Sequence, residues 1–159
     1  KLAALCSRNA SRDIFDARLL LTMKELDPAK LRLGFVVYGG VNRKDWRTVS
    51  AGGLAADPQE VRRSLLPTLR KNLSPPVREI GAWTEKLVLE CRELLSAVLP
   101  LKPPEAEFIR RLNDQAEIAP ELLTDDEAMR SVIRNHPGLR WKAMNVRKHR
   151  GLPESGESD

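Results

Sequence analysis

The sequence predicts an all-α protein, an irregular bundle of about six to eight helices. Three observations favour this class. Apolar residues recur every three or four positions over most of the chain. Asp-Pro pairs, which combine an N-cap with proline in the first turn, precede two such segments, at Asp27 and Asp57. No Asn-Gly or Asp-Gly turn joins a pair of strand-like segments, and no internal repeat is present.

In the first half of the chain, the apolar spacing predicts helices over residues 2–5, 12–26 and 28–38. Ser11 is the expected N-cap of the second helix, and Gly39-Gly40 is expected to end the third. A buried strand over residues 33–38 is the alternative, because Val-Val-Tyr favours β structure. Residues 39–57, which hold four glycines, predict a long connection around a short helical turn at residues 45–49.

In the second half, a helix is expected from Pro58 until Pro67 breaks it, followed by a linker at residues 74–76. The longest amphipathic pattern covers residues 77–98 and ends at Pro100. Further helices are expected over residues 103–112, from a Thr-x-x-Glu capping box at Thr124, and over residues 139–149. Residues 1–150 are thus expected to be one helical domain, and residues 151–159, rich in Gly, Ser and acid, a disordered tail.

Composition limits the possible classes of protein. The 159 residues carry a net charge of +5, with 42% hydrophobic and 31% charged residues, which suits one globular domain. No apolar stretch approaches the roughly 18 residues of a membrane-spanning helix. Cys6 and Cys91 are expected to be buried and reduced, and no secretory signal is visible, so a cytoplasmic location is expected. A chain that starts at Lys1 inside a helical pattern is expected to be a processed product or a fragment.

The first local constellation of interest lies near the N-terminus. Asp13 and Asp16 are three residues apart and would share one face of a helix, with Arg8, Arg12 and Arg18 nearby. One interpretation is a surface ion pair between Arg12 and Asp16. The other is metal-assisted phosphoryl transfer, which uses paired carboxylates beside arginines.

The second feature is a segregation of charge. The chain between Ala128 and Arg150 has seven basic residues and no acidic one: Arg130, Arg134, Arg140, Lys142, Arg147, Lys148 and Arg150. Such a surface would attract a phosphate backbone, and Trp141 among these residues could stack on a base or, alternatively, belong to the core. A second stretch without acids covers residues 61–78.

Two segments resemble one known family. The N-terminal Lys-Leu-Ala-Ala-Leu, followed by Arg8 and by Arg-Asp-Ile-Phe-Asp at residues 12–16, resembles the Lys-Leu-x-Ala-Leu…Arg…Arg-Asp-x-x-Asp segment of the AbiEii/AbiGii nucleotidyltransferase toxins. These proteins belong to abortive-infection and type IV toxin–antitoxin systems. The segments at residues 110–123 and 136–148 look like the helical C-terminal region of the same family. The resemblance therefore extends over nearly the whole chain.

The resemblance implies a role for each N-terminal residue. Lys1 would face a nucleoside triphosphate, Asp13 and Asp16 would act as the catalytic carboxylates together with Lys1, and Arg8 and Arg12 would help to bind the nucleotide. The family's palm domain carries a Gly-Ser motif and metal-binding aspartates, and neither occurs in this sequence. We therefore expect magnesium and a nucleoside triphosphate as cofactors of a longer protein, with no metal ligand and no cofactor expected for this chain alone, which would be catalytically incomplete.

The resemblance also implies partners. Family members transfer a nucleotide to RNA, in some cases tRNA, and Arg140, Lys142, Arg147 and Lys148 are the predicted RNA-binding residues. A cognate antitoxin would accompany the longer protein, and a further hypothesis is self-association of the fragment through an uncovered apolar face. The alternative function is a helical module without enzymatic activity that binds nucleic acid or a partner protein through its basic surfaces.

Overall fold

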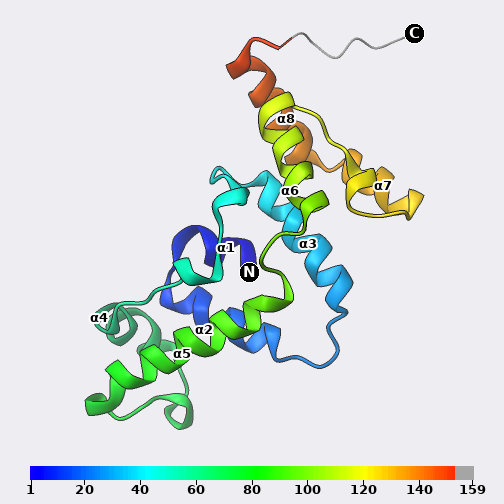
Figure 1. Ribbon diagram of the computed structural model, residues 1–159. Helices are drawn as coiled ribbons and strands as arrows, with labels where there is room; N and C mark the ends of the chain where they lie inside the picture. Colours follow the sequence, from blue (N-terminus) through cyan, green and yellow to red (C-terminus); the bar gives the residue numbers. More distant parts are fainter. Residues whose placement is uncertain (153–159) are drawn as a thin grey trace. The chain divides into compact units, whose positions relative to one another are not determined.

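The computed structural model describes residues 1–152, and these residues confirm the all-α class with eight α-helices and no strand (Figure 1). They divide into two compact units. Unit 1 comprises Lys1–Arg32 and Val49–Pro100, and unit 2 comprises Leu33–Thr48 and the chain from Leu101. Most of the predicted tail, residues 153–159, lies outside the described residues.

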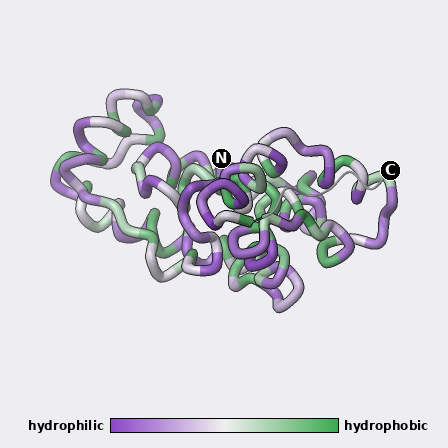
Figure 2. The backbone as a smooth tube through the Cα atoms, turned by 90° about the horizontal axis from the view of Figure 1, so that it is seen from above, coloured by the Kyte–Doolittle hydropathy of each residue, from purple (hydrophilic) through white to green (hydrophobic). Residues whose placement is uncertain are grey.

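Hydrophobic and hydrophilic residues alternate along the chain (Figure 2). In the helix at residues 80–94, for example, Ile80, Leu87 and Cys91 are buried, whereas Glu85 and Lys86 are exposed to solvent. Among the described residues, no helix has the length and apolar content that a membrane crossing requires.

Unit 1 is built on α1 (Leu2–Arg8), α2 (Ser11–Leu21) and α5 (Ile80–Leu94), the longest helix. Helix α2 packs against α5, with Ile14 and Leu87 buried. The predicted helix after Asp57 is split into α4 (Pro58–Glu60), a π turn and a 3-10 turn that contains Pro67. Both cysteines are free and buried, as predicted.

Helix α2 differs from the prediction at both ends. Its N-cap is Ala10, and Ser11 lies inside the first turn, where its buried hydroxyl has no hydrogen-bond partner among the described residues. The helix ends at Leu21 and does not continue to Leu26. The reason is local. The Thr22 hydroxyl donates to the carbonyl oxygens of Arg18 and Leu19, and it so satisfies acceptors that backbone amides would pair with in a longer helix.

Helix α3 (Pro28–Val41) continues through Gly39 and Gly40, where the sequence predicted an end. The glycines serve close packing, because a β-carbon on Gly39 would lie 2.1 Å from Nε1 of the buried Trp46. The alternative of a strand over residues 33–38 is wrong, since these residues are helical. The short turn predicted at residues 45–49 is present as a 3-10 turn, Trp46–Thr48.

Unit 2 combines the C-terminal part of α3 with α6 (Pro103–Arg110), α7 (Glu127–Arg134) and α8 (Pro137–Arg150). Its core contains three aromatic and four aliphatic side chains from these elements and from the turns between them: Phe35, Trp46, Phe108, Ile109, Leu112, Ile133 and Leu139. A π turn, Arg111–Gln115, follows α6 directly and contacts α8.

The start of α7 corrects the predicted capping box. The N-cap is Asp126, whose Oδ1 accepts a hydrogen bond from the Met129 amide at 3.0 Å. Thr124 lies two residues earlier, and its hydroxyl accepts from the Asp126 amide at 3.2 Å. Asp is the better N-cap because its carboxylate also interacts favourably with the helix dipole.

Candidate functional site

The N-terminal cluster of charged residues forms two ion pairs in unit 1. Lys1 Nζ lies 2.5 Å from Asp16 Oδ2. Arg8 donates from Nε to Asp13 Oδ2 at 3.1 Å and from Nη2 to Asp13 Oδ1 at 2.9 Å, a two-pronged contact that fixes the orientation of the carboxylate. The structure therefore brings together four of the five residues that the family resemblance singles out.

The fifth residue, Arg12, is engaged elsewhere. Its Nε donates to the carbonyl oxygen of Ser64 at 2.8 Å, which connects α2 to the π turn of unit 1. The ion pair between Arg12 and Asp16 that the spacing suggested is not formed among the described residues, because Asp16 pairs with Lys1. Arg12 thus has a structural contact within this chain.

The two carboxylates differ in exposure and neither is free. The Asp13 side chain is 10% exposed and both its oxygens accept from Arg8, whereas the Asp16 side chain is 40% exposed. The hydrogen bond and charge of Asp16 raise the pKa of Lys1, which keeps the ammonium protonated. Because cations of the chain already neutralise both carboxylates, Asp13 and Asp16 do not fit a magnesium site as they stand. The described residues contain no group of three or more potential metal ligands.

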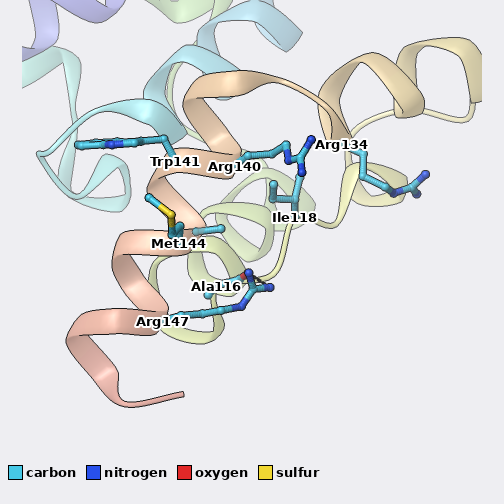
Figure 3. A pocket seen from close by; sticks show the side chains of 8 residues that line it. Ala116, Ile118, Arg134, Arg140, Trp141, Met144 and Arg147 are labelled. Atoms are coloured by element: carbon cyan, nitrogen blue, oxygen red, sulfur yellow. Dashed lines mark hydrogen bonds between the residues drawn. The ribbon is translucent and has the colours of Figure 1, made fainter. Parts of the chain in front are cut away.

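A second candidate site is a groove of about 550 Å³ in unit 2 (Figure 3). This volume lies within the roughly 300–1,000 Å³ of typical ligand sites. Three arginines and five apolar residues line it: Arg134, Arg140, Arg147, Ala116, Ile118, Trp141, Ala143 and Met144. No carboxylate is among the lining residues, so the charge of the groove is positive.

Helix α8 positions most of this groove. His136 caps the helix by accepting a hydrogen bond from the Leu139 amide, and Pro137 occupies its first position. Leu139 and Ala143 are buried, which directs Arg140 and the residues one and two turns after it to the outside. In Figure 3, Arg140 extends toward Ile118 and Arg134, and Arg147 extends toward Ala116.

The arginines of the groove differ in their partners. Arg147 Nη2 donates to the carbonyl oxygen of Ala116 at 3.2 Å, which leaves most of the guanidinium donors unused. The side chains of Arg134 and Arg140 are exposed and form no hydrogen bond or ion pair with other residues of the described chain. Their charges are therefore available to an anionic ligand.

The two predicted lysines do not line the groove. Lys142 Nζ donates to the carbonyl oxygen of Asn42 at 2.7 Å, and burial lowers the pKa of this lysine although the charge of Asp45 opposes the shift. Lys142 thus ties α8 to the end of α3. Lys148 is exposed on the last turn of α8, where its charge also complements the helix dipole.

The interpretation of Trp141 as a core residue is wrong. Its side chain is 53% exposed, and that of the neighbouring Met144 is 58% exposed. Two large apolar side chains therefore border the groove in contact with solvent. Proteins use exposed aromatic rings to stack bases and guanidinium groups to hold phosphates. In Figure 3 the Trp141 ring extends away from the guanidinium groups of the groove.

Sequence reasoning missed Ala116 and Ile118, which form the far wall of the groove together with Arg134, one of the predicted basic residues. The left-handed conformation of Ala116, with φ 56°, ends the π turn and leads the chain to Ile118. Nothing in the local sequence shows that Ala116 and Ile118 face α8, because they lie more than 20 residues before the α8 residues of the groove. The chain matches no protein-family model, no curated protein and no solved structure.

Proposed function

We propose that the chain binds single-stranded RNA through the groove on α8, as the helical part of a longer nucleotidyltransferase-like protein. The observation that supports this most directly is a groove whose lining includes three arginines and the exposed Trp141 and no carboxylate. The choice of RNA over other nucleic acids rests on the family resemblance of the sequence.

Each group has a chemical role in this proposal. Trp141 stacks on a base, which requires an unpaired nucleotide because bases inside a duplex hide their faces. Arg134, Arg140 and Arg147 contact phosphates, where a guanidinium can form two parallel hydrogen bonds. Lys142 and Lys148 do not line the groove and contribute only long-range attraction.

The test is a fluorescence-anisotropy titration with a labelled ten-nucleotide uridine oligomer and with an RNA duplex of the same length. We expect tighter binding of the single strand. Trp141→Ala should weaken it about tenfold, since stacking is worth roughly 1–3 kcal/mol per base. Lys30→Ala, which removes an exposed cation from the first turn of α3, is the control and should change affinity less than twofold. Equal affinity of wild type and Trp141→Ala would contradict the proposal.

Nucleotide transfer to RNA is a second candidate function, supported by the assembly of Lys1, Asp16, Arg8 and Asp13 into paired charges. In a longer protein that supplies the palm motifs, Lys1 would contact the triphosphate and Asp16 would hold the lysine in place. Magnesium would then be bound by palm residues, because both carboxylates described here are already neutralised. A cognate antitoxin, self-association and a cytoplasmic location stay predictions.

The transfer proposal requires the longer protein, incubated with labelled nucleoside triphosphates, magnesium and total tRNA. Asp16→Asn should abolish labelling of the RNA without unfolding the protein, since Asp16 is partly exposed. Asp13→Asn is interpretable only alongside a thermal unfolding curve, because it removes a buried partner of Arg8. Unchanged labelling in Asp16→Asn would exclude a role for this pair.

A further inference from the structure

The chain between α4 and α5 forms an exposed loop in unit 1, which we call the basic loop (residues 69–78). The loop is held at both ends, because Leu65 before it and Ile80 after it are buried. The turns at its two ends, Val61–Leu65 and Val77–Glu79, both contact α5. Between these anchors, seven of the ten loop residues are exposed. The basic loop therefore rests on a fixed base and can contact a partner without unfolding.

The basic loop carries positive charge that the described chain leaves largely unpaired. Arg70, Lys71 and Arg78 are exposed, and the loop contains no acidic residue. The side chains of Arg70 and Lys71 form no hydrogen bond or ion pair with other described residues. Arg78 Nε lies 3.3 Å from Glu79 Oε1, but both side chains are largely exposed, so this pair contributes little. The charge of the loop is therefore available to an anionic partner.

Two aliphatic side chains lie among these cations in the sequence. Leu73 is 47% exposed and Val77 is 67% exposed. The Leu73 amide donates to the carbonyl oxygen of Arg70 at 2.9 Å, so a 3-10 turn holds the leucine close to the arginine. Exposed apolar side chains that are grouped together mark interaction surfaces. The partner of the basic loop must therefore accept apolar groups as well as neutralise cations.

An anionic lipid bilayer meets both requirements. Its phosphates and carboxylates attract lysine and arginine, and aliphatic side chains enter the boundary between the headgroups and the acyl chains. RNA meets only the first requirement, since residues 61–79 contain no aromatic side chain that could stack on a base. The chemistry of the basic loop thus favours a lipid surface over a nucleic acid.

We propose that the basic loop binds the surface of an anionic bilayer, with Leu73 and Val77 inserted between headgroups and the three cations paired with lipid phosphates and carboxylates. Such a contact involves one leaflet and needs no helix that crosses the membrane. It does not depend on the RNA groove, which belongs to unit 2. Each lysine or arginine near an anionic membrane strengthens binding about fivefold, so the contact is reversible and weakened by salt.

The experiment measures co-sedimentation of the full chain with vesicles of phosphatidylcholine, with and without about one-third phosphatidylserine. We expect binding only to the anionic vesicles. Arg70→Gln/Lys71→Gln/Arg78→Gln should lower this binding about 100-fold. The control variant Lys24→Gln/Lys30→Gln/Arg43→Gln removes the same charge from exposed positions elsewhere and should bind at least about tenfold more tightly than the loop variant. Equal binding by the two variants, or no preference for anionic vesicles, would overturn the inference.

A second readout tests the apolar part of the contact. Because both native cysteines are buried, Leu73→Cys supplies one accessible thiol for a polarity-sensitive dye. Leu19→Cys on α2 is the matched control, since Leu19 is also 47% exposed. Emission from position 73 should move to shorter wavelength when anionic vesicles are added, whereas emission from position 19 should not. Equal shifts at the two positions, or no shift at position 73, would contradict insertion of the loop.

A titration with an RNA duplex separates the lipid surface from a nucleic acid. The loop variant and the control variant should bind the duplex with similar affinity, because the basic loop is assigned to lipid. A selective loss of duplex affinity in the loop variant, together with no binding of the wild type to vesicles, would reject the inference and assign the loop to nucleic acid.

Discussion

Gly39 lies directly against the indole of Trp46, so close that a β-carbon at position 39 would be 2.1 Å from Nε1. Trp46 is fully buried, so it has no space into which it can move. We therefore expect Gly39→Ala to destabilise the protein by about 3 kcal/mol or more, at or above the upper end of typical overpacking costs. Urea unfolding followed by far-ultraviolet circular dichroism measures this change.

Gly34 supplies a matched control on the same helix. A β-carbon there would have no neighbour within 4 Å, and the residue is in the interior of α3. Gly34→Ala should stabilise the protein by about 0.5–1 kcal/mol through better helix propensity. A similar effect of the two substitutions would show that Gly39 is not constrained by Trp46.

The pH dependence of stability should include a contribution from Glu107. Hydrogen bonds from Arg110 and Arg111 lower the pKa of Glu107 from 4.5 to about 2. A carboxylate whose pKa is lower in the folded state stabilises the protein above its unfolded pKa, and this contribution is lost as the pH falls from about 4.5 to 2. Glu107→Gln should accordingly be less stable than the wild type at pH 6, and the two unfolding midpoints should converge at pH 2. A constant difference across that range would contradict the assignment.

Cys91 should be unreactive in the folded protein. Burial raises the pKa of its thiol to about 11, so the thiolate is scarce at pH 8, and the side chain is inaccessible. In a Cys6→Ser background, a disulfide reagent that reports free thiols should label Cys91 only after urea is added. Rapid labelling without urea would show that α5 opens or that the thiol is exposed.

Two cations on α8 should differ in their effect on RNA binding. Arg140 has an unpaired guanidinium in the groove, whereas Lys142 is held by the carbonyl oxygen of Asn42. Arg140→Ala should lower the slope of log affinity against log salt by about 0.7, the loss of one phosphate contact with a single strand. Lys142→Ala should leave the slope nearly unchanged, and equal slopes for both variants would argue against a specific groove.

Local sequence patterns predicted the all-α class because apolar spacing and helix caps are local signals. They also predicted that Asp13 and Asp16 lie on one helix and that α8 is basic. Local patterns failed where contacts between distant segments determine the structure. Gly39 lies inside a helix, where Trp46 packs against it, and Ile118 lines the groove although it is far from α8 in the sequence. The sequence left open whether Trp141 is buried or exposed, because its spacing from Leu139 does not show which face of α8 it occupies.

Photochemical cross-linking tests the central claim most directly. The chain is irradiated with a radiolabelled uridine oligomer, and the cross-linked peptides are identified by mass spectrometry. A base stacked on Trp141 should give cross-links on α8 that are centred on Trp141 and absent in Trp141→Ala. Cross-links confined to unit 1, or unchanged yield in Trp141→Ala, would contradict RNA binding in this groove.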